Sequence, residues 1–124
     1  MAHAPPFLEI ATPALATRDG QMPLKVTATD DTRILDAYIF VGSRKVFYRS
    51  NRNGNDPRTL AFDSQIPLRP GVNIVNVVAR ENPDTTTRRT FVVRRDATDG
   101  AILKTPKTDD PVADWLGEAG GPED

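Results

Sequence analysis

The sequence predicts an all-β protein: an immunoglobulin-like antiparallel β-sandwich of about seven strands, followed by a disordered acidic C-terminal tail. Short runs rich in β-branched and aromatic residues recur along residues 6–96, and turn-forming residues separate them. Several runs alternate apolar and polar residues, and no stretch before residue 96 has a capped start and a 3.6-residue apolar period. Many short strands with short turns favour two packed sheets, with a small, partly open barrel as the alternative.

Each expected strand follows from its local pattern. The two prolines of the first run keep residues 5–6 out of a central strand. The run 22–30 alternates Leu24, Val26 and Ala28 with polar residues, as expected of a half-buried strand. The full set of expected strands is the N-terminal PPFLEI and the ranges 22–30, 34–41, 44–49, 59–68, 72–81 and 86–95.

A turn is predicted at Pro70-Gly71, just before the strand Val72–Glu81. Proline fixes φ for the second position of a β-turn, and glycine supplies the positive φ of the third, as in a type II turn. Both faces of the following strand are fairly apolar, which predicts a central strand with a partly covered outer face. The alternation predicts a core-facing set and an outward-facing set: Val75, Val77 and Ala79, and Ile74, Asn76, Val78 and Arg80.

The chain is divided into three parts: a disordered N-terminus or cloning remnant (1–5), the sandwich (6–96) and the tail (97–124). The tail is rich in Gly, Pro, Asp and Glu and offers too little apolar surface to offset its ordering. Within it, Asp110-Pro111 and Gly117 bound a short helical pattern that contains Trp115. This segment is either an incidental apolar island, a docking helix for a partner, or a segment that lies against the basic body of its own chain.

Composition excludes several classes of function. The net charge is −1, with +4 on residues 1–96 (14 Lys and Arg against 10 Asp and Glu) and −5 on residues 97–124 (2 against 7). This bias is too weak for a dedicated nucleic-acid binder, and no apolar run is long enough for membrane insertion. The absence of cysteine excludes disulfides, thiolate catalysis and zinc–cysteine sites.

Catalytic and metal-binding patterns are weak. His3 is the only histidine and lies at the extreme N-terminus, and no serine occupies a Gly-x-Ser-x-Gly elbow. We therefore expect no catalytic residue and no cofactor in this chain. The segment 51–56 places oxygen-bearing side chains like a calcium loop, but it lacks the final bidentate Glu, so a hairpin loop is favoured. Calcium binding between loops by Asp30 and Asp31 with Asp56 or Asp84 is the minor alternative.

Aromatic and cationic residues supply the candidate protein-binding site. Phe62 and Phe91 are assigned to the core. For the other aromatics, packing is the favoured interpretation. If the second face of the strand 34–41 is exposed, however, its aromatics and nearby arginines form a surface patch of the residue types enriched at interface hot spots. The candidate residues, with Trp115 of the tail added, are Tyr38, Phe40, Tyr48, Arg44, Arg49 and Trp115.

Four motifs carry a family resemblance over about residues 6–108. They are D-x-Y-x-F-V from Asp36, K-x-F-Y-x-S-N from Lys45, L-x-P-G-x-N from Leu68 and V-V-A-R-E from Val77. Together they resemble the Ig-like domain at the C-terminus of some bacterial carboxy-terminal processing (tail-specific) proteases of the S41 serine class. The L-x-P-G-x-N portion also occurs in many bacterial Ig-like adhesion and carbohydrate-enzyme modules.

The resemblance implies a non-catalytic accessory module of a secreted bacterial serine protease. In that family a Ser/Lys pair in a separate domain performs catalysis, and no position here matches it. The implied role is protein–protein contact for substrate capture, positioning or oligomerisation, with a periplasmic or secreted location. A carbohydrate-binding or surface-adhesion Ig-like module, or a structural spacer, are the alternatives.

Overall fold

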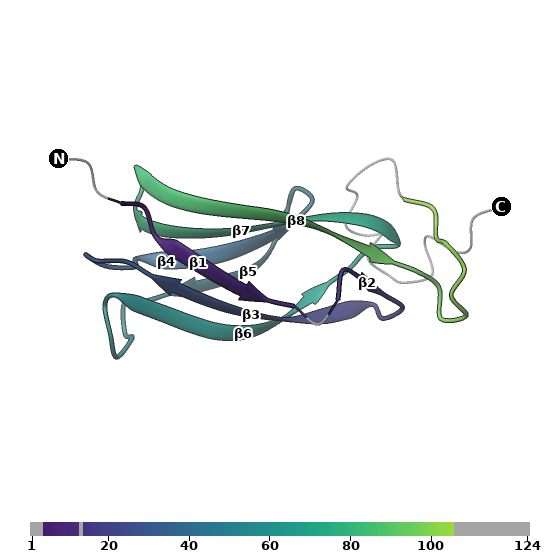
Figure 1. The fold of residues 1–124 in the computed structure, drawn as a ribbon, viewed down its shortest axis with the longest axis horizontal. Coiled ribbons are helices and arrows are strands. Elements are labelled where there is room, and N and C mark those ends of the chain that lie inside the picture. Colours follow the sequence, from purple (N-terminus) through teal and green to yellow (C-terminus); the bar gives the residue numbers. More distant parts are fainter. Residues whose placement is uncertain (1–3, 13, 106–124) are drawn as a thin grey trace.

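Two β-sheets pack face to face in the computed structural model, which describes residues 4–12 and 14–105 (Figure 1). One sheet has three strands in the order β1-β3-β6, and the other has five in the order β2-β8-β7-β4-β5. None of the described residues forms a helix that could cross a membrane. The strands are β1 (Phe7–Ala11), β2 (Ala16–Thr17), β3 (Gln21–Thr29), β4 (Asp36–Val41), β5 (Arg44–Ser50), β6 (Thr59–Pro67), β7 (Gly71–Asn82) and β8 (Thr85–Arg95).

The predicted fold class is confirmed, and the seven expected strands are present with shifted ends. The eighth strand, β2, was not predicted because a two-residue strand carries no periodicity; it pairs in parallel with Arg94 and Arg95 of β8. Ile34 lies outside β4, although its side chain is only 3% exposed. An apolar loop residue that fills the core is indistinguishable in sequence from the first residue of a strand.

The hairpin predicted for residues 51–56 is wrong, because β5 and β6 belong to different sheets. The connection crosses from one sheet to the other and is organised by the buried side chain of Asn51. Its amide Nδ2 donates to the carbonyl oxygen of Ile34 at 3.1 Å and of Asp56 at 3.2 Å. A crossing connection requires the same turn-forming residues as a hairpin, so composition alone did not separate the two.

The core lies between the sheets and consists of inward-facing aliphatic side chains. On β7, Val75, Val77 and Ala79 are fully buried, as predicted. Val78 faces outward but is only 4% exposed, which confirms the partly covered outer face. Phe62 is buried, and the half-buried Phe91 packs against the core cluster.

The turn before β7 confirms the requirement for glycine. Gly71 has a φ of 82°, a conformation that other residues adopt at a cost. A Cβ atom at this position would also lie 2.6 Å from Cα of Thr105. Gly71 therefore serves both the turn and the close approach of the chain segment that follows β8.

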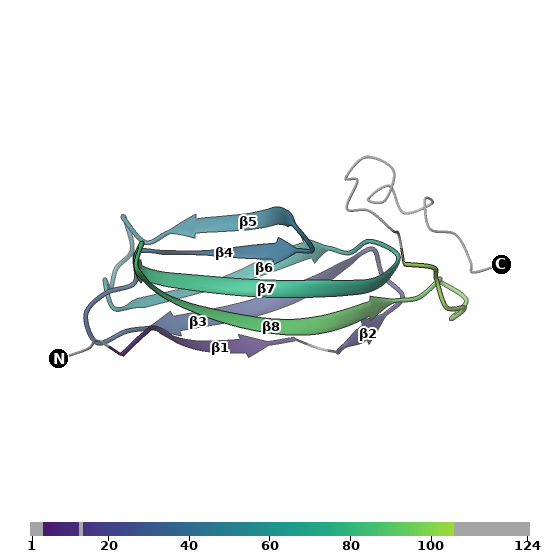
Figure 2. The ribbon, with the colours of Figure 1, turned by 90° about the horizontal axis from the view of Figure 1, so that it is seen from above.

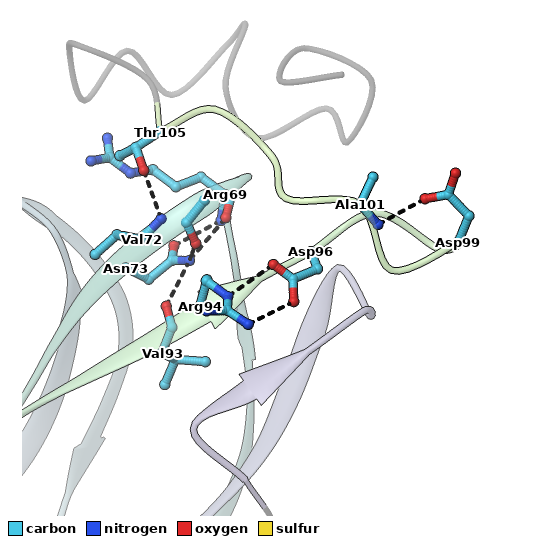
Figure 3. Close-up of polar contacts among 10 residues, drawn as sticks. Arg69, Val72, Asn73, Val93, Arg94, Asp96, Asp99, Ala101 and Thr105 are labelled. Carbon is cyan, nitrogen blue, oxygen red and sulfur yellow. Dashed lines mark hydrogen bonds and ion pairs between the residues drawn. The ribbon is translucent and has the colours of Figure 1, made fainter. Parts of the chain in front are cut away.

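Residues 96–105 return along the end of the five-stranded sheet (Figure 3). The side chain of Leu103 is 6% exposed, and the backbone N–H of Val72 donates to Oγ1 of Thr105 at 2.9 Å. The domain division at residue 96 stays a prediction. Trp115 and the helical pattern around it lie outside the described residues.

Candidate functional site

The outward face of β4 and β5 carries three aromatic side chains. Tyr38 and Phe40 project from the side of β4 opposite the buried Ala37, Ile39 and Val41, and Tyr48 of β5 pairs with Tyr38 in the strand register. Tyr48 is 51% exposed, and Tyr38 and Phe40 are half-buried. The condition that the sequence left open, that this face looks outward, is met, and a binding role for it stays a prediction.

The three rings contact one another. The Tyr38 and Tyr48 rings stack with centroids 6.4 Å apart, and the Phe40 ring meets Tyr38 edge-on at 5.6 Å. Both arrangements are favoured by the quadrupoles of aromatic rings. We call these three residues, with Asp36, Lys45 and Arg80, the aromatic cluster.

The cations of the cluster differ from those predicted. Nζ of Lys45 lies 5.6 Å from the Tyr38 centroid and 5.7 Å from that of Tyr48, and Cζ of Arg80 lies 5.6 Å from Tyr38. These are cation–π distances. The cluster is therefore a surface of flat rings with two cations beside them.

Arg49 is wrongly placed in the predicted patch, because it lies on the other face of β5 from Tyr48. Its Cζ lies 5.5 Å from the Phe47 ring and 5.9 Å from that of Phe62.

Arg44 is also displaced from the predicted patch. A β-bulge between Ile39 and Phe40 pairs Lys45 with Phe40, and leaves Arg44 opposite the inward-facing Val41. Because a bulge changes which residues face outward, Lys45 takes the position expected for Arg44.

A buried carboxylate anchors the cluster. Asp36 is 2% exposed and accepts two hydrogen bonds from Arg80, from Nε at 2.7 Å and from Nη2 at 2.6 Å. Tyr48 Oη donates a third at 3.0 Å. Burial raises the pKa of Asp36, but the hydrogen bonds from Arg80 and Tyr48 outweigh it and hold the pKa below its usual value. The same contacts raise the pKa of Tyr48 and of Arg80.

The Asp36 carboxylate should make stability depend on pH. Because its pKa is lowered in the folded state, its contribution is present above the ordinary carboxyl pKa of about 4 and is lost as pH falls through the lower folded value. We expect Asp36→Asn to reduce the free energy of unfolding by about 1–2 kcal/mol at neutral pH, since Arg80 keeps partial access to water. Urea unfolding across the acid range should show that the difference in unfolding free energy between the variant and the parent protein becomes smaller below pH 4.

Asp63→Asn is the matched control, because Asp63 is an exposed carboxylate of β6. At neutral pH its unfolding free energy should lie within about 0.5 kcal/mol of that of the parent protein. If the difference in unfolding free energy between Asp36→Asn and the parent protein stayed constant with pH, it would contradict the charged role assigned to Asp36.

The loop carboxylates considered for calcium are only partly brought together. Carboxylate oxygens of Asp30, Asp31 and Glu81 lie within 4.8 Å of one another. Asp56, which the sequence offered as a partner, instead accepts hydrogen bonds from the backbone N–H of Arg58 at 2.9 Å and from Thr59 Oγ1 at 3.4 Å. The third carboxylate near Asp30 and Asp31 is thus Glu81 of β7 rather than a residue of the 51–56 loop.

Surface hollows also lie away from the aromatic cluster. One of about 600 Å³ lies beside β3 and β6, and its lining includes Pro23, Lys25, Asp63 and Gln65. The serine nearest to it has a structural role, because Ser64 Oγ donates to the carbonyl oxygen of Leu24 at 3.2 Å. The aromatic cluster is the candidate site because it brings aromatic and cationic side chains together on an outward face.

The two-sheet topology defines this chain as an immunoglobulin-like β-sandwich domain. Its fold is similar to that of the PKD domain of an M14-like peptidase from Thermoplasmatales archaeon SCGC AB-540-F20, with a TM-score of 0.50 and 17% sequence identity. The similarity covers 76% of this chain and 98% of the archaeal domain. At this identity the similarity concerns the fold alone. No family model and no curated protein matches the sequence.

Proposed function

We propose that this chain is a non-catalytic accessory module of a secreted bacterial protease and acts by protein–protein contact. Two independent resemblances support a protease context: the motifs shared with carboxy-terminal processing proteases, and the fold shared with a domain of an M14-like peptidase. The motifs favour a serine protease of the S41 class as the parent and a periplasmic or secreted location. The role of the module is to capture or position an extended polypeptide.

The single observation that carries this proposal is that the aromatic cluster lies beside an open sheet edge. In the order β2-β8-β7-β4-β5, strand β5 is an outer strand (Figure 2). An outer strand can accept an extended peptide through main-chain hydrogen bonds, and alternate side chains of the peptide then meet the adjoining face. Here that face presents the exposed ring of Tyr48 and the ammonium group of Lys45.

Adding unfolded substrate peptides to the isotope-labelled chain tests the proposal. We expect amide shift changes concentrated on Arg44–Ser50 and their marked weakening in Tyr48→Ala. Phe7→Ala is the matched control, because Phe7 is a 59% exposed aromatic residue of the other sheet. An absence of shifts at millimolar peptide would contradict capture by this edge.

The exposed ring of Tyr48, which stacks with Tyr38, also favours a second candidate, carbohydrate binding, because an exposed aromatic ring can stack on a sugar. Shifts at Tyr48 with oligosaccharides and none with peptides would select it. Binding of neither would favour a structural spacer.

The coding sequence upstream of residue 5 tests which class of protease the module belongs to. An S41-type domain encoded there supports the serine class, and a metallopeptidase domain contradicts that class.

A further inference from the structure

A second surface of the five-stranded sheet is apolar and exposed. Val72 and Ile74 near the start of β7 are 41% and 51% exposed, and Val92 of β8 is 49% exposed. Ile74 and Val92 are direct partners in the strand register, so their side chains are neighbours on the outward face. We call these three residues the apolar patch.

The described chain ends beside this patch. Thr105 Oγ1 accepts the hydrogen bond from the backbone N–H of Val72 at 2.9 Å (Figure 3). The residues that follow Thr105 therefore leave from the edge of the apolar patch. Val112 lies seven positions after Thr105, and an extended chain of that length spans about 24 Å. The patch extends only about 7 Å along β7 from Val72 to Ile74, so Val112 and its neighbours can reach all of it.

The chemistry of residues 106–124 matches this face. Val112, Trp115 and Leu116 are their large apolar residues, set among six acidic residues and one lysine. The outward positions of β4, β5, β7 and β8 carry the basic residues Lys45, Arg80, Arg88 and Arg94. Two of them already form ion pairs, Arg80 with Asp36 and Arg94 with Asp96, so Lys45 and Arg88 carry the charge complementarity. Apolar side chains can thus meet the patch while carboxylates face the surrounding cations.

We propose that residues 112–116 of the same chain cover the apolar patch. A segment joined to its target by a short linker has an effective concentration in the millimolar range, so weak contacts suffice to hold it. Burial of the Trp115 indole supplies much of the favourable free energy of this contact, since burying an aromatic side chain removes a large apolar area from water. The tail is then a cover for the sheet of its own chain.

Trp115 is the only tryptophan of the chain, so its fluorescence reports on the tail alone. We expect the full chain to show a blue-shifted emission and reduced quenching by acrylamide. Ile74→Glu should shift the emission to the red and increase quenching. Phe7→Glu is the matched control, because it places the same charge at a 59% exposed apolar site on the other sheet, and it should change neither signal.

Removal of residues 106–124 supplies a second measurement that does not depend on a variant of the sheet. We expect chemical-shift changes at the methyl groups of Val72, Ile74 and Val92. Emission typical of a water-exposed indole in the full chain, with no methyl shifts on truncation, would overturn the proposal. A blue shift that disappears on dilution would also overturn it, by showing that a second copy occupies the patch. Peptide capture at β5 is measured at other residues, so either proposal can fail alone.

Discussion

Val77→Asp is expected to unfold the domain or to lower its free energy of unfolding by more than about 4 kcal/mol. Val77 is fully buried in the middle of β7, between β4 and β8, and its partners in the register are Ile39 and Arg89. The substitution removes buried methyl groups and places a carboxylate in a core of mainly aliphatic side chains, where the exposed Arg89 is its neighbour on β8. Chemical denaturation followed by circular dichroism measures the loss.

Asn76→Asp is the control, one residue earlier on the same strand. Asn76 faces outward, and its Oδ1 accepts a hydrogen bond from Thr90 Oγ1 at 2.6 Å, a bond that an aspartate oxygen can also accept. We expect a loss within about 0.5 kcal/mol. Similar losses for the two variants would mean that the faces of β7 are assigned incorrectly.

Strand β7 shows why the fold could be predicted from sequence. It is a run rich in β-branched residues whose side chains largely alternate between a buried and an outward face, and the turn before it requires glycine at a positive φ. Such information is local, within a few residues. The ends of the elements were less predictable, because Ile34 fills the core from a loop and β2 has only two residues.

Only some residues of the aromatic cluster could be predicted from the sequence, namely those whose position follows from the alternation of side chains along one strand. Tyr38, Phe40 and Tyr48 were placed correctly because they follow the period of their strands. Asp36 and Arg80 are 44 positions apart, and only the pairing of β4 with β7 brings them together. Lys45 reaches the cluster through a bulge, which no residue pattern in this sequence marks. The missing information is therefore strand pairing, which depends on the whole fold.

The motif L-x-P-G-x-N has a structural explanation here. Leu68 is 1% exposed, Gly71 provides the positive φ, and Asn73 is fully buried at the end of the sandwich. The Asn73 side chain accepts from the N–H of Arg69 at 2.9 Å and donates to the carbonyl oxygens of Arg69 and Gly71 at 2.9 and 3.2 Å (Figure 3). A further bond reaches the carbonyl oxygen of Val93 at 3.3 Å and joins the turn to β8.

Asn73→Ala should therefore be the second most damaging change, with a loss of about 2–4 kcal/mol, because buried backbone groups of the turn lose their partners. Thermal and urea unfolding measure it, and Asn76→Ala on the outward face should cost far less. Asn73→Asp separates the two halves of the side chain: it keeps an acceptor for the N–H of Arg69 and lacks the donor for the three carbonyl oxygens. If Asn73→Ala were no worse than Asn76→Ala, the motif would need an explanation other than closure of this turn.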